Sequence, residues 1–274
     1  MEYPKFSVLM SLYIKEKPEF LNEAIESIIN QTVKPSEILI VYDGPVTDEL
    51  DSVVKKYDAQ NPGLFTILRN KENKGLGLAL ADGIPRCKYD LIARMDTDDI
   101  SRSDRFEKQL KVFVDNSQID ICGSHILEFE DNKENIVAQR KVPLTNSEIR
   151  EYQKKRDGFN HVTVMYKKKS VLDAGNYQTC LLMEDTLLWA NMFMNGAKGM
   201  NIDESLVYAR IGSDMYERRG GLDYFKKYKE GRKRIYKTGF ISKFDYYETL
   251  LIQLIVAILP NQIRGFIFKK ILHH

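Results

Sequence analysis

The chain has 274 residues, which is room for one large domain or for one domain with an appendage. Apolar residues make up 43% and charged residues 29%, so a packed globular core is expected and general disorder is excluded. The formal net charge of +2 does not fit a dedicated nucleic-acid-binding protein, which usually carries a strong basic excess.

The near-balance of charge hides an uneven distribution along the chain. From Arg218 to His274 there are 13 Lys/Arg against 4 Asp/Glu, a net charge of +9. The other 217 residues carry 28 Lys/Arg against 35 Asp/Glu, a net charge of −7. Two segments of opposite net charge indicate a basic face for an anionic neighbour, either a membrane or a nucleic acid.

Strand and helix patterns alternate through the first hundred residues. Short apolar runs predict strands over residues 6–13, 37–43, 65–70 and 89–96. Helices are predicted between them, over residues 18–31, 47–60 and 75–87. This alternation implies βαβ crossovers and a largely parallel sheet, and therefore an α/β fold.

A parallel sheet also predicts where a ligand lies. Ligands bind at the carboxyl ends of the strands, near the point where the strand order reverses. Asp43 ends the second predicted strand and Asp96 ends the fourth. Both acids are therefore expected at the binding edge of the sheet.

The pattern loosens beyond Asp99. Helices are predicted over residues 103–116 and 183–196, the second ending at Gly196. The further strands are expected over residues 119–130, 161–168 and 201–211, and residues 140–159 are expected to be irregular or helical.

The C-terminal tail differs in composition from the rest of the chain. Residues 222–237 alternate Tyr and Phe with Lys and Arg, and residues 250–259 read LLIQLIVAIL. A run of ten residues, nine of them apolar, is well short of the ~20 that a membrane span needs, whereas an apolar segment flanked by cations and aromatics suits a helix in the interface. The alternative is a helix packed on the core or on a second subunit, so a homodimer stays open.

Three cysteines are too few and too widely spaced for a disulfide framework. Cys87, Cys122 and Cys180 are therefore expected to be buried free thiols in a reducing compartment. The N-terminus has neither a charged n-region nor a cleavable apolar region, so no secretion signal is expected.

The aspartates of RMDTDDIS form the main acidic cluster. In an extended segment, Asp96 and Asp98 face the same way and could bind one ion. Oxygen ligands without Cys or His favour Mg²⁺ or Mn²⁺, which take their other ligands from phosphates and water. The alternative is a solvated acidic turn in which an aspartate caps a helix.

Two glycine-containing stretches lie near the same predicted edge. Asp43-Gly44 ends a strand, where a carboxylate could bind a base edge or a ribose hydroxyl. Lys74-Gly75 opens NKGLGLALADG, whose glycines let the backbone approach a ligand. The spacing is not GxGxxG, which disfavours a dinucleotide.

Motif order carries a family resemblance. The runs are SVLMSLY, QTVKPSEILIVYDGP, NKGLGLALADGI, YDLIARMDTDDIS, DRFEKQ, HVTVMYKKKSVLDAGNY and MEDTLLWANMFMNGAKGMNIDESLVYAR. Together they resemble the family 2 glycosyltransferases with a GT-A fold, most of all the bacterial capsule, lipopolysaccharide and exopolysaccharide branch. The resemblance covers about residues 5–212.

The resemblance implies a role for each matching residue. Asp185 matches the general base. The acceptor side would include Glu184, Trp189 and His161. Asp96 and Asp98 match the DxD that holds the metal and the donor diphosphate, with Asp99 in support. The nucleotide and donor would contact Asp43, Gly44, Lys74, Gly75, Arg94, Asp96 and the loop residues Arg218 and Arg219.

Three positions depart from the family pattern. Tyr42 precedes Asp43 where many members have a second aspartate, and Asp82 stands where asparagine is common. The usual proline before Arg105 is missing. None of these differences removes a reactive group.

The sequence thus predicts a GT-A catalytic domain over residues 1–215 and a basic, apolar helical extension over residues 216–274. The predicted activity is inverting, metal-dependent transfer of a sugar from a nucleotide diphosphate donor, expected to be a UDP-sugar, to a lipid-linked or growing glycan. The protein is expected in the cytoplasm, attached peripherally to the inner face of the membrane through its extension, with no nucleic-acid partner.

Two alternatives stay open. A sugar-phosphate nucleotidylyltransferase also combines an α/β sheet with acidic metal ligands, but it needs a glycine-rich phosphate loop after the first strand, where this chain reads SLYIKEKPEF. A non-catalytic scaffold subunit would have lost the DxD or the Glu184-Asp185 pair, and both are present.

Overall fold

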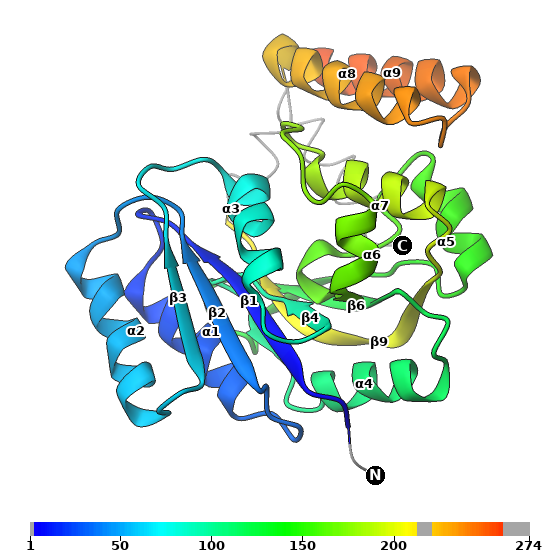
Figure 1. The fold of residues 1–274 in the computed structure, drawn as a ribbon. Helices are drawn as coiled ribbons and strands as arrows, with labels where there is room; N and C mark the ends of the chain where they lie inside the picture. Colours follow the sequence, from blue (N-terminus) through cyan, green and yellow to red (C-terminus); the bar gives the residue numbers. More distant parts are fainter. Residues whose placement is uncertain (1–2, 213–220, 260–274) are drawn as a thin grey trace.

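A computed structural model describes residues 3–212 and 221–259. In this part of the chain, nine strands form one sheet with helices on both faces (Figure 1), which confirms the α/β prediction. The strands are β1 (Phe6–Leu12), β2 (Glu37–Tyr42), β3 (Phe65–Arg69), β4 (Leu91–Arg94), β5 (Ile100–Ser101), β6 (Ile121–Phe129), β7 (Ile136–Arg140), β8 (Met165–Lys167) and β9 (Gly199–Arg210).

The helices follow the predicted positions in the N-terminal half and add short elements in the C-terminal half. The α-helices are α1 (Pro18–Ile29), α2 (Asp48–Gln60), α3 (Leu76–Gly83), α4 (Arg105–Asp115), α5 (Asn146–Gln153), α6 (Lys168–Asp173), α7 (Glu184–Met194), α8 (Gly221–Lys237) and α9 (Lys243–Ile258). Two 3₁₀ turns are η1 (Ile84–Arg86) and η2 (His161–Thr163).

Strand order divides the sheet into two parts. The order is β3-β2-β1-β4-β8-β6-β9-β5, and β7 pairs with β6 at the side. The first four strands are parallel, as their βαβ pattern predicts. Beyond β4 the sheet becomes mixed, because β8 runs antiparallel to both β4 and β6 while β6 and β9 are parallel.

Alternate side chains of the central strands pack into two separate hydrophobic cores, one on each face of the sheet. Leu9 and Val41 point to the face covered by α3, α6 and α7, where they join Trp189. Met10 and Ile40 point to the opposite face and pack against α1, α2 and α4. A strand buried on both faces reads as a continuous apolar run, and β2 is buried along its whole length.

The sequence prediction differs from the structure between residues 136 and 168. The strand expected over 161–168 is reduced to β8, because η2 turns the backbone before it. The stretch expected to be irregular or helical contains α5, which begins at a capping box between Thr145 and Glu148. No pattern in the sequence predicted β7, α6 or the two-residue strand β5.

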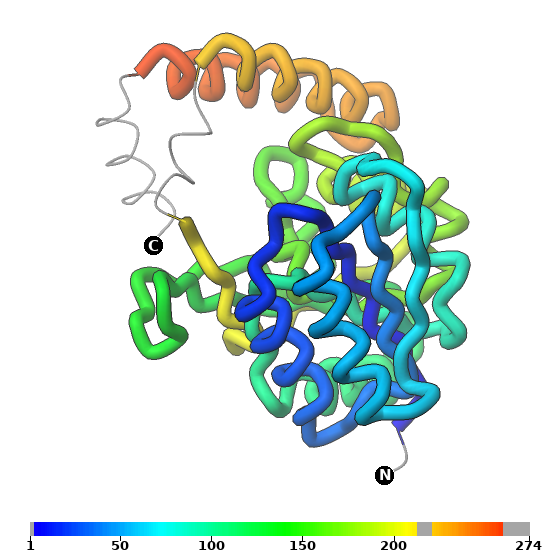
Figure 2. Tube along the Cα trace, turned by 90° about the vertical axis from the view of Figure 1, so that its left-hand side faces the viewer, coloured from blue at the N-terminus to red at the C-terminus, as the bar shows by residue number. Residues whose placement is uncertain are grey.

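The C-terminal helices form an outer layer at one end of the molecule. Figures 1 and 2 show α8 and α9 side by side, lying across the end that carries α7. Phe240, between the two helices, stacks on Phe193 of α7 with ring centroids 5.7 Å apart. Ile235 and Ile241 join the same core as Trp189.

Two predictions concern the C-terminal tail: where it begins, and that it is too short in apolar residues to cross a membrane. The domain boundary at 215/216 lies outside the described residues and stays a prediction. Within residues 3–212 and 221–259, no helix has both the length and the apolar character that crossing a bilayer requires.

All three cysteines are buried and free, as predicted.

Candidate active site

The carboxyl ends of β2 and β4 open into one cavity of about 420 Å³. Asp43 follows β2, and Asp96 and Asp98 follow β4, and all three line this cavity. Parallel pairing of β1 with both strands brings their ends to the same edge of the sheet. The two acids that the sequence placed at the binding edge therefore share a cavity, and Glu16 lines it as well.

Each aspartate of the acidic cluster has a different environment. Asp96 accepts a hydrogen bond from Nη1 of the buried Arg94 at 2.6 Å and contacts its Nη2 as well. Asp99 is buried and accepts the backbone N–H of Arg210 at 2.7 Å. Burial, together with the negative charges of Asp96 and Glu16, raises the pKa of Asp98 to about 7.

This cluster fits a divalent cation. Asp96, Asp98 and Asp99 each offer a carboxylate oxygen, and the three oxygens lie within 4.8 Å of one another. Hard oxygen donors in this number suit Mg²⁺ or Mn²⁺. Because Asp99 is already engaged by a backbone N–H and is almost fully buried, Asp96 and Asp98 are the two that line the cavity.

Asp43 also organises the loop before α3. Its carboxylate accepts the backbone N–H groups of Lys74 at 2.8 Å and Gly75 at 2.9 Å. Gly44 has φ +88°, and a Cβ there would lie 2.7 Å from the backbone nitrogen of Asn73. Glycine is therefore required at residue 44, where the turn after β2 meets this loop.

The side chain of Lys74 points to a partner on α3. Its Nζ lies 2.8 Å from a carboxylate oxygen of Asp82. Asp82 is one of the positions that departs from the family pattern, and in this structure its carboxylate contacts Lys74 across the first turns of α3. The expected donor contact of Lys74 stays a prediction.

A second cavity, of about 650 Å³, contains Asp185 and His161. We call it the basic cavity because Arg140, Lys141, Lys155 and Arg156 line it too. His161 Nδ1 lies 3.8 Å from Asp185 Oδ2, and His161 Nε2 lies 2.7 Å from the hydroxyl of Tyr177. Burial, with the nearby charge of Arg94, holds the pKa of His161 well below its ordinary value, so its imidazole is neutral at neutral pH.

The surroundings of Asp185 raise the pKa of its carboxyl group. Burial, together with the negative charges of Asp157 and Glu184, raises its pKa to about 8. Asp157 accepts a hydrogen bond from the Thr186 hydroxyl at 2.5 Å, next to Asp185 in α7. The sequence analysis missed Asp157, because it lies in a polar stretch with no motif and only the fold brings it to α7.

Glu184 and Trp189 lie at different depths beside this cavity. Glu184 packs on α3, since a Cβ at Gly77 would lie 2.9 Å from its Cβ. Trp189 is 1% exposed and lies behind His161, with the two rings edge to face at 5.9 Å. Its burial leaves it no surface in the cavity, so a direct contact between Trp189 and an acceptor is not favoured.

Arg94 connects the two cavities. It is almost fully buried, contacts Asp96 on one side, and lowers the pKa of both Asp185 and His161 on the other. Arg105, the first residue of α4, donates from Nη2 to the backbone carbonyl of Arg94 at 2.8 Å and so helps to fix the backbone of Arg94. One buried cation thus serves both groups of acids.

Another unpredicted residue supports the acidic cluster. Arg210, near the end of β9, donates from Nε to the carbonyl of Asp98 at 3.0 Å and from its backbone to Asp99. Its guanidinium lies 3.8 Å from the ring centroid of Phe20 in α1. The motif YAR ends a predicted strand and gave no signal for this role. Arg218 and Arg219 lie outside the described residues.

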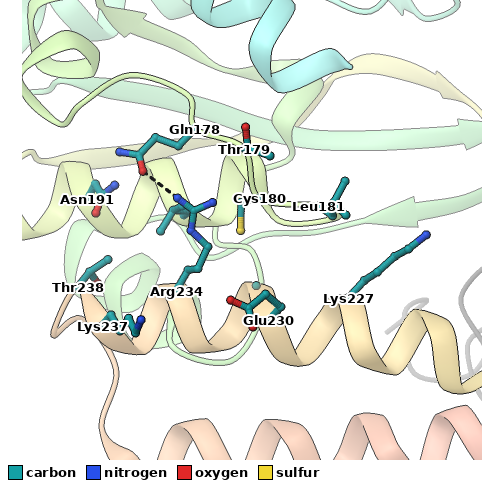
Figure 3. Close-up of a pocket in the computed structure, with 12 residues that line it drawn as sticks. Gln178, Thr179, Cys180, Leu181, Asn191, Lys227, Glu230, Arg234, Lys237 and Thr238 are labelled. Carbon is teal, nitrogen blue, oxygen red and sulfur yellow. Dashed lines mark hydrogen bonds between the residues drawn. The ribbon is translucent and has the colours of Figure 1, made fainter. Parts of the chain in front are cut away.

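Helix α8 holds the loop that leads to Asp185. Figure 3 shows Arg234 of α8 hydrogen bonded to Gln178 of this loop, at 3.2 Å. A Cβ at Gly231 of α8 would lie 2.8 Å from Sδ of Met183, the residue before Glu184. Leu182 in the same loop has φ +69°, a conformation rare for a side chain of this size.

Sequence comparisons agree with the motif order. The model of the family described as Glycosyl transferase family 2 matches residues 7–175. A curated Escherichia coli protein, UDP-Gal:alpha-D-GlcNAc-diphosphoundecaprenol beta-1,3-galactosyltransferase, is 40% identical over 98% of this chain and 97% of its own. The amylovoran biosynthesis glycosyltransferase AmsE of Erwinia amylovora is 36% identical over 97% of this chain and 98% of its own.

Solved structures share the fold at low identity. The mannosyltransferase PcManGT of Pyrobaculum calidifontis, in complex with GDP-Man and Mn²⁺, has a TM-score of 0.65 at 14% identity and covers 96% of this chain and 72% of its own. S. aureus TarS 1-349 in complex with UDP has a TM-score of 0.61 at 16% identity, over 95% of this chain and 68% of its own.

Proposed function

The chain belongs to glycosyl transferase family 2, and we propose that it moves a hexose from a UDP-sugar to a lipid-linked glycan diphosphate in bacterial polysaccharide synthesis. One observation carries the proposal. Leu76 of α3 lines the cavity with Asp43, Asp96 and Asp98, and Gly77 of the same helix packs against Glu184, the residue before Asp185 of the second cavity. Helix α3 therefore borders both sites, and in this proposal the donor and the acceptor meet beside it.

On the donor side, Asp43 would contact the uracil base and the backbone at Gly44 and Gly75 would border the nucleotide. Asp96 and Asp98 would hold a divalent cation, Mn²⁺ or Mg²⁺. Such an ion offsets the negative charge that develops on a leaving nucleoside diphosphate. The presence of Mn²⁺ in one solved neighbour and UDP in another supports this assignment by analogy of fold.

On the acceptor side, Asp185 is the proposed general base. A sugar hydroxyl attacks the anomeric carbon while Asp185 takes its proton, and the bond to the diphosphate breaks with its electron pair leaving on the diphosphate oxygen. Attack opposite the leaving group inverts the anomeric centre. His161, neutral and 3.8 Å from Asp185, is placed to orient the carboxyl or the acceptor.

Attachment to the inner face of the cell membrane is part of the proposal. A lipid-linked acceptor requires the active site to lie close to a bilayer. The outer face of α9 exposes a stripe of large apolar side chains at helical spacing, namely Phe244, Tyr247, Leu251, Ile255 and Ile258. Such a stripe is typical of helices that lie in the membrane interface.

Replacement of the base tests the activity. Asp185→Asn should lower the rate of UDP release with a lipid-diphosphate acceptor by ~100-fold or more, because a general base contributes at least this factor. The affinity for UDP with Mn²⁺, measured by calorimetry, should stay unchanged. Asp173→Asn, which alters an exposed carboxylate on α6, is the control. Equal turnover of Asp185→Asn and wild type would refute the assignment.

A further inference from the structure

Among the described residues, four cationic side chains line the basic cavity, against the two carboxyl groups of Asp157 and Asp185. Arg140 lies 3.7 Å from Glu128, and Lys155 pairs with Glu248 at 2.8 Å. Lys141 and Arg156, by contrast, have no acidic partner among the described residues, and both are exposed where they line the cavity. Unpaired cations that border one cavity attract an anion of matching size.

Another part of the lining of the basic cavity is apolar. Ile252 and Val256 of α9 line it together with Leu182, and the side chains of Ile252 and Leu182 are about half exposed. Exposed aliphatic side chains facing a cavity favour a hydrocarbon ligand. An occupant that satisfies both walls has an anionic group next to an aliphatic chain.

A buried arginine fixes the two walls relative to each other. Arg232 of α8 is 1% exposed, and its Nη2 donates to the carbonyl of Lys154 at 2.6 Å. Its Nε donates to the Thr249 hydroxyl of α9 at 3.1 Å. The segment that carries Lys155 and Arg156 is thus tied to the helix that carries the apolar wall, so the cavity is built by the fold.

We propose that the basic cavity binds the diphosphate and the first isoprenoid carbons of the acceptor lipid. Lys141 and Arg156 bind the diphosphate oxygens, with the guanidinium suited to bidentate contact, and Ile252 and Val256 contact the hydrocarbon. Because Asp185 lines the same cavity, the sugar attached to this diphosphate lies next to the general base. The inference rests on the proposed function for the identity of the acceptor.

Binding of farnesyl diphosphate to the full chain tests the cavity without turnover. Calorimetry is done in EDTA, so that the aspartates of the metal cluster cannot hold the diphosphate through an ion. The double variant Lys141→Gln/Arg156→Gln should bind at least ~10-fold more weakly, because it loses the charge-assisted hydrogen bonds to the diphosphate. The control Lys111→Gln/Lys169→Gln, which removes two cations outside the cavity, should bind as wild type does.

Two further ligands separate the contributions of the walls. Farnesol should bind wild type at least ~10-fold more weakly than farnesyl diphosphate, because it lacks the anion. Ile252→Ser should weaken farnesyl diphosphate binding and leave inorganic diphosphate binding unchanged. Equal affinity of wild type and the Lys141/Arg156 double variant for farnesyl diphosphate would overturn the proposal.

Turnover distinguishes this inference from the proposed function. The acceptors are N-acetylglucosamine linked through a diphosphate to farnesyl and a phosphate-free alkyl N-acetylglucosaminide. The double variant should raise KM at least ~10-fold for the first acceptor only. If wild type transfers to neither acceptor, the proposed function fails. If transfer occurs and the double variant matches wild type with both, the inference alone fails.

A membrane role for the two cations is the remaining alternative. Binding to phosphatidylglycerol vesicles, measured by co-sedimentation, should be the same for wild type and the Lys141→Gln/Arg156→Gln variant. Loss of vesicle binding with unchanged farnesyl diphosphate binding would assign both residues to the bilayer and refute the lipid-diphosphate site.

Discussion

At the scale of single residues, the site depends on charges that compensate one another over short distances. Arg94 contacts Asp96 and lowers the pKa of Asp185, while Asp157 raises it. The sequence predicts roles for Arg94, Asp96 and Asp185 from their places in motifs. It could not identify Asp157, because its role comes from a hydrogen bond to Thr186 across 29 positions of the chain.

The pH dependence of transfer should report this balance. The raised pKa of Asp185 means that the protonated form, which cannot act as a base, persists at neutral pH, so activity should rise with pH toward 8. Asp157→Asn removes a negative neighbour and keeps an oxygen for Thr186. The alkaline-rising limb of kcat/KM for the acceptor should therefore move to lower pH by roughly 1 unit.

The other ionisable groups around Asp185 are unchanged in this variant, and a carboxylate that does not act on Asp185 provides the control. Glu184 also raises the pKa, Arg94 lowers it, and His161 is neutral. Asp203→Asn, at an exposed carboxylate beside His125, should leave the limb in place. If kcat/KM of Asp157→Asn rises at the same pH as that of the wild type, or at a higher pH, the electrostatic assignment is contradicted.

At the scale of elements, the entry to α7 is held from outside by α8. A Cβ at Gly231 would lie 2.8 Å from Sδ and 3.3 Å from Cβ of Met183, so Met183, which directly precedes Glu184-Asp185, would have to shift. The α8 pattern predicts a helix, and glycine in its interior is unfavourable by about 1 kcal/mol relative to alanine. The packing against Met183 explains why a glycine stands at residue 231 inside this helix.

Gly231→Ala should therefore gain helix propensity and lose activity. The added methyl displaces Met183 and with it the start of α7, and a shift of the base by about 1 Å can cost ~100-fold in rate. We expect a lower kcat with unchanged affinity for UDP and Mn²⁺. The double variant Gly231→Ala/Met183→Ala restores the space and should recover activity relative to Gly231→Ala; absence of any recovery would contradict this steric account.

At the scale of the whole molecule, α8 and α9 lie across the end that carries α7 (Figure 1), and residues of both helices line the basic cavity. Their exposed surface combines the apolar stripe of α9 with a row of lysines on α8, namely Lys226, Lys229, Lys233 and Lys237. Cations near an anionic bilayer contribute about 1 kcal/mol each. A membrane along these helices would lie close to the cavity proposed for the lipid.

Vesicle binding should depend on that stripe. Leu251→Ser/Ile255→Ser should weaken co-sedimentation with phosphatidylglycerol vesicles by ~10-fold, because partial burial of two aliphatic side chains contributes roughly 1–3 kcal/mol. Both side chains are more than half exposed, so the melting temperature should change little. Leu172→Ser, at an exposed leucine of α6, is the control, and equal loss in both variants would argue against a specific stripe.

By itself, the sequence determined the local parts of this protein. Apolar periodicity located the parallel strands and their helices, and motif order indicated the family, the metal cluster and Asp185, because these signals are contained in short stretches. It could not determine the antiparallel turn at β8, the place of Arg210 under Asp98, or the cavity that joins Lys141 and Arg156 to α9. Those arrangements depend on contacts between segments far apart in the chain, which only the packed tertiary structure decides.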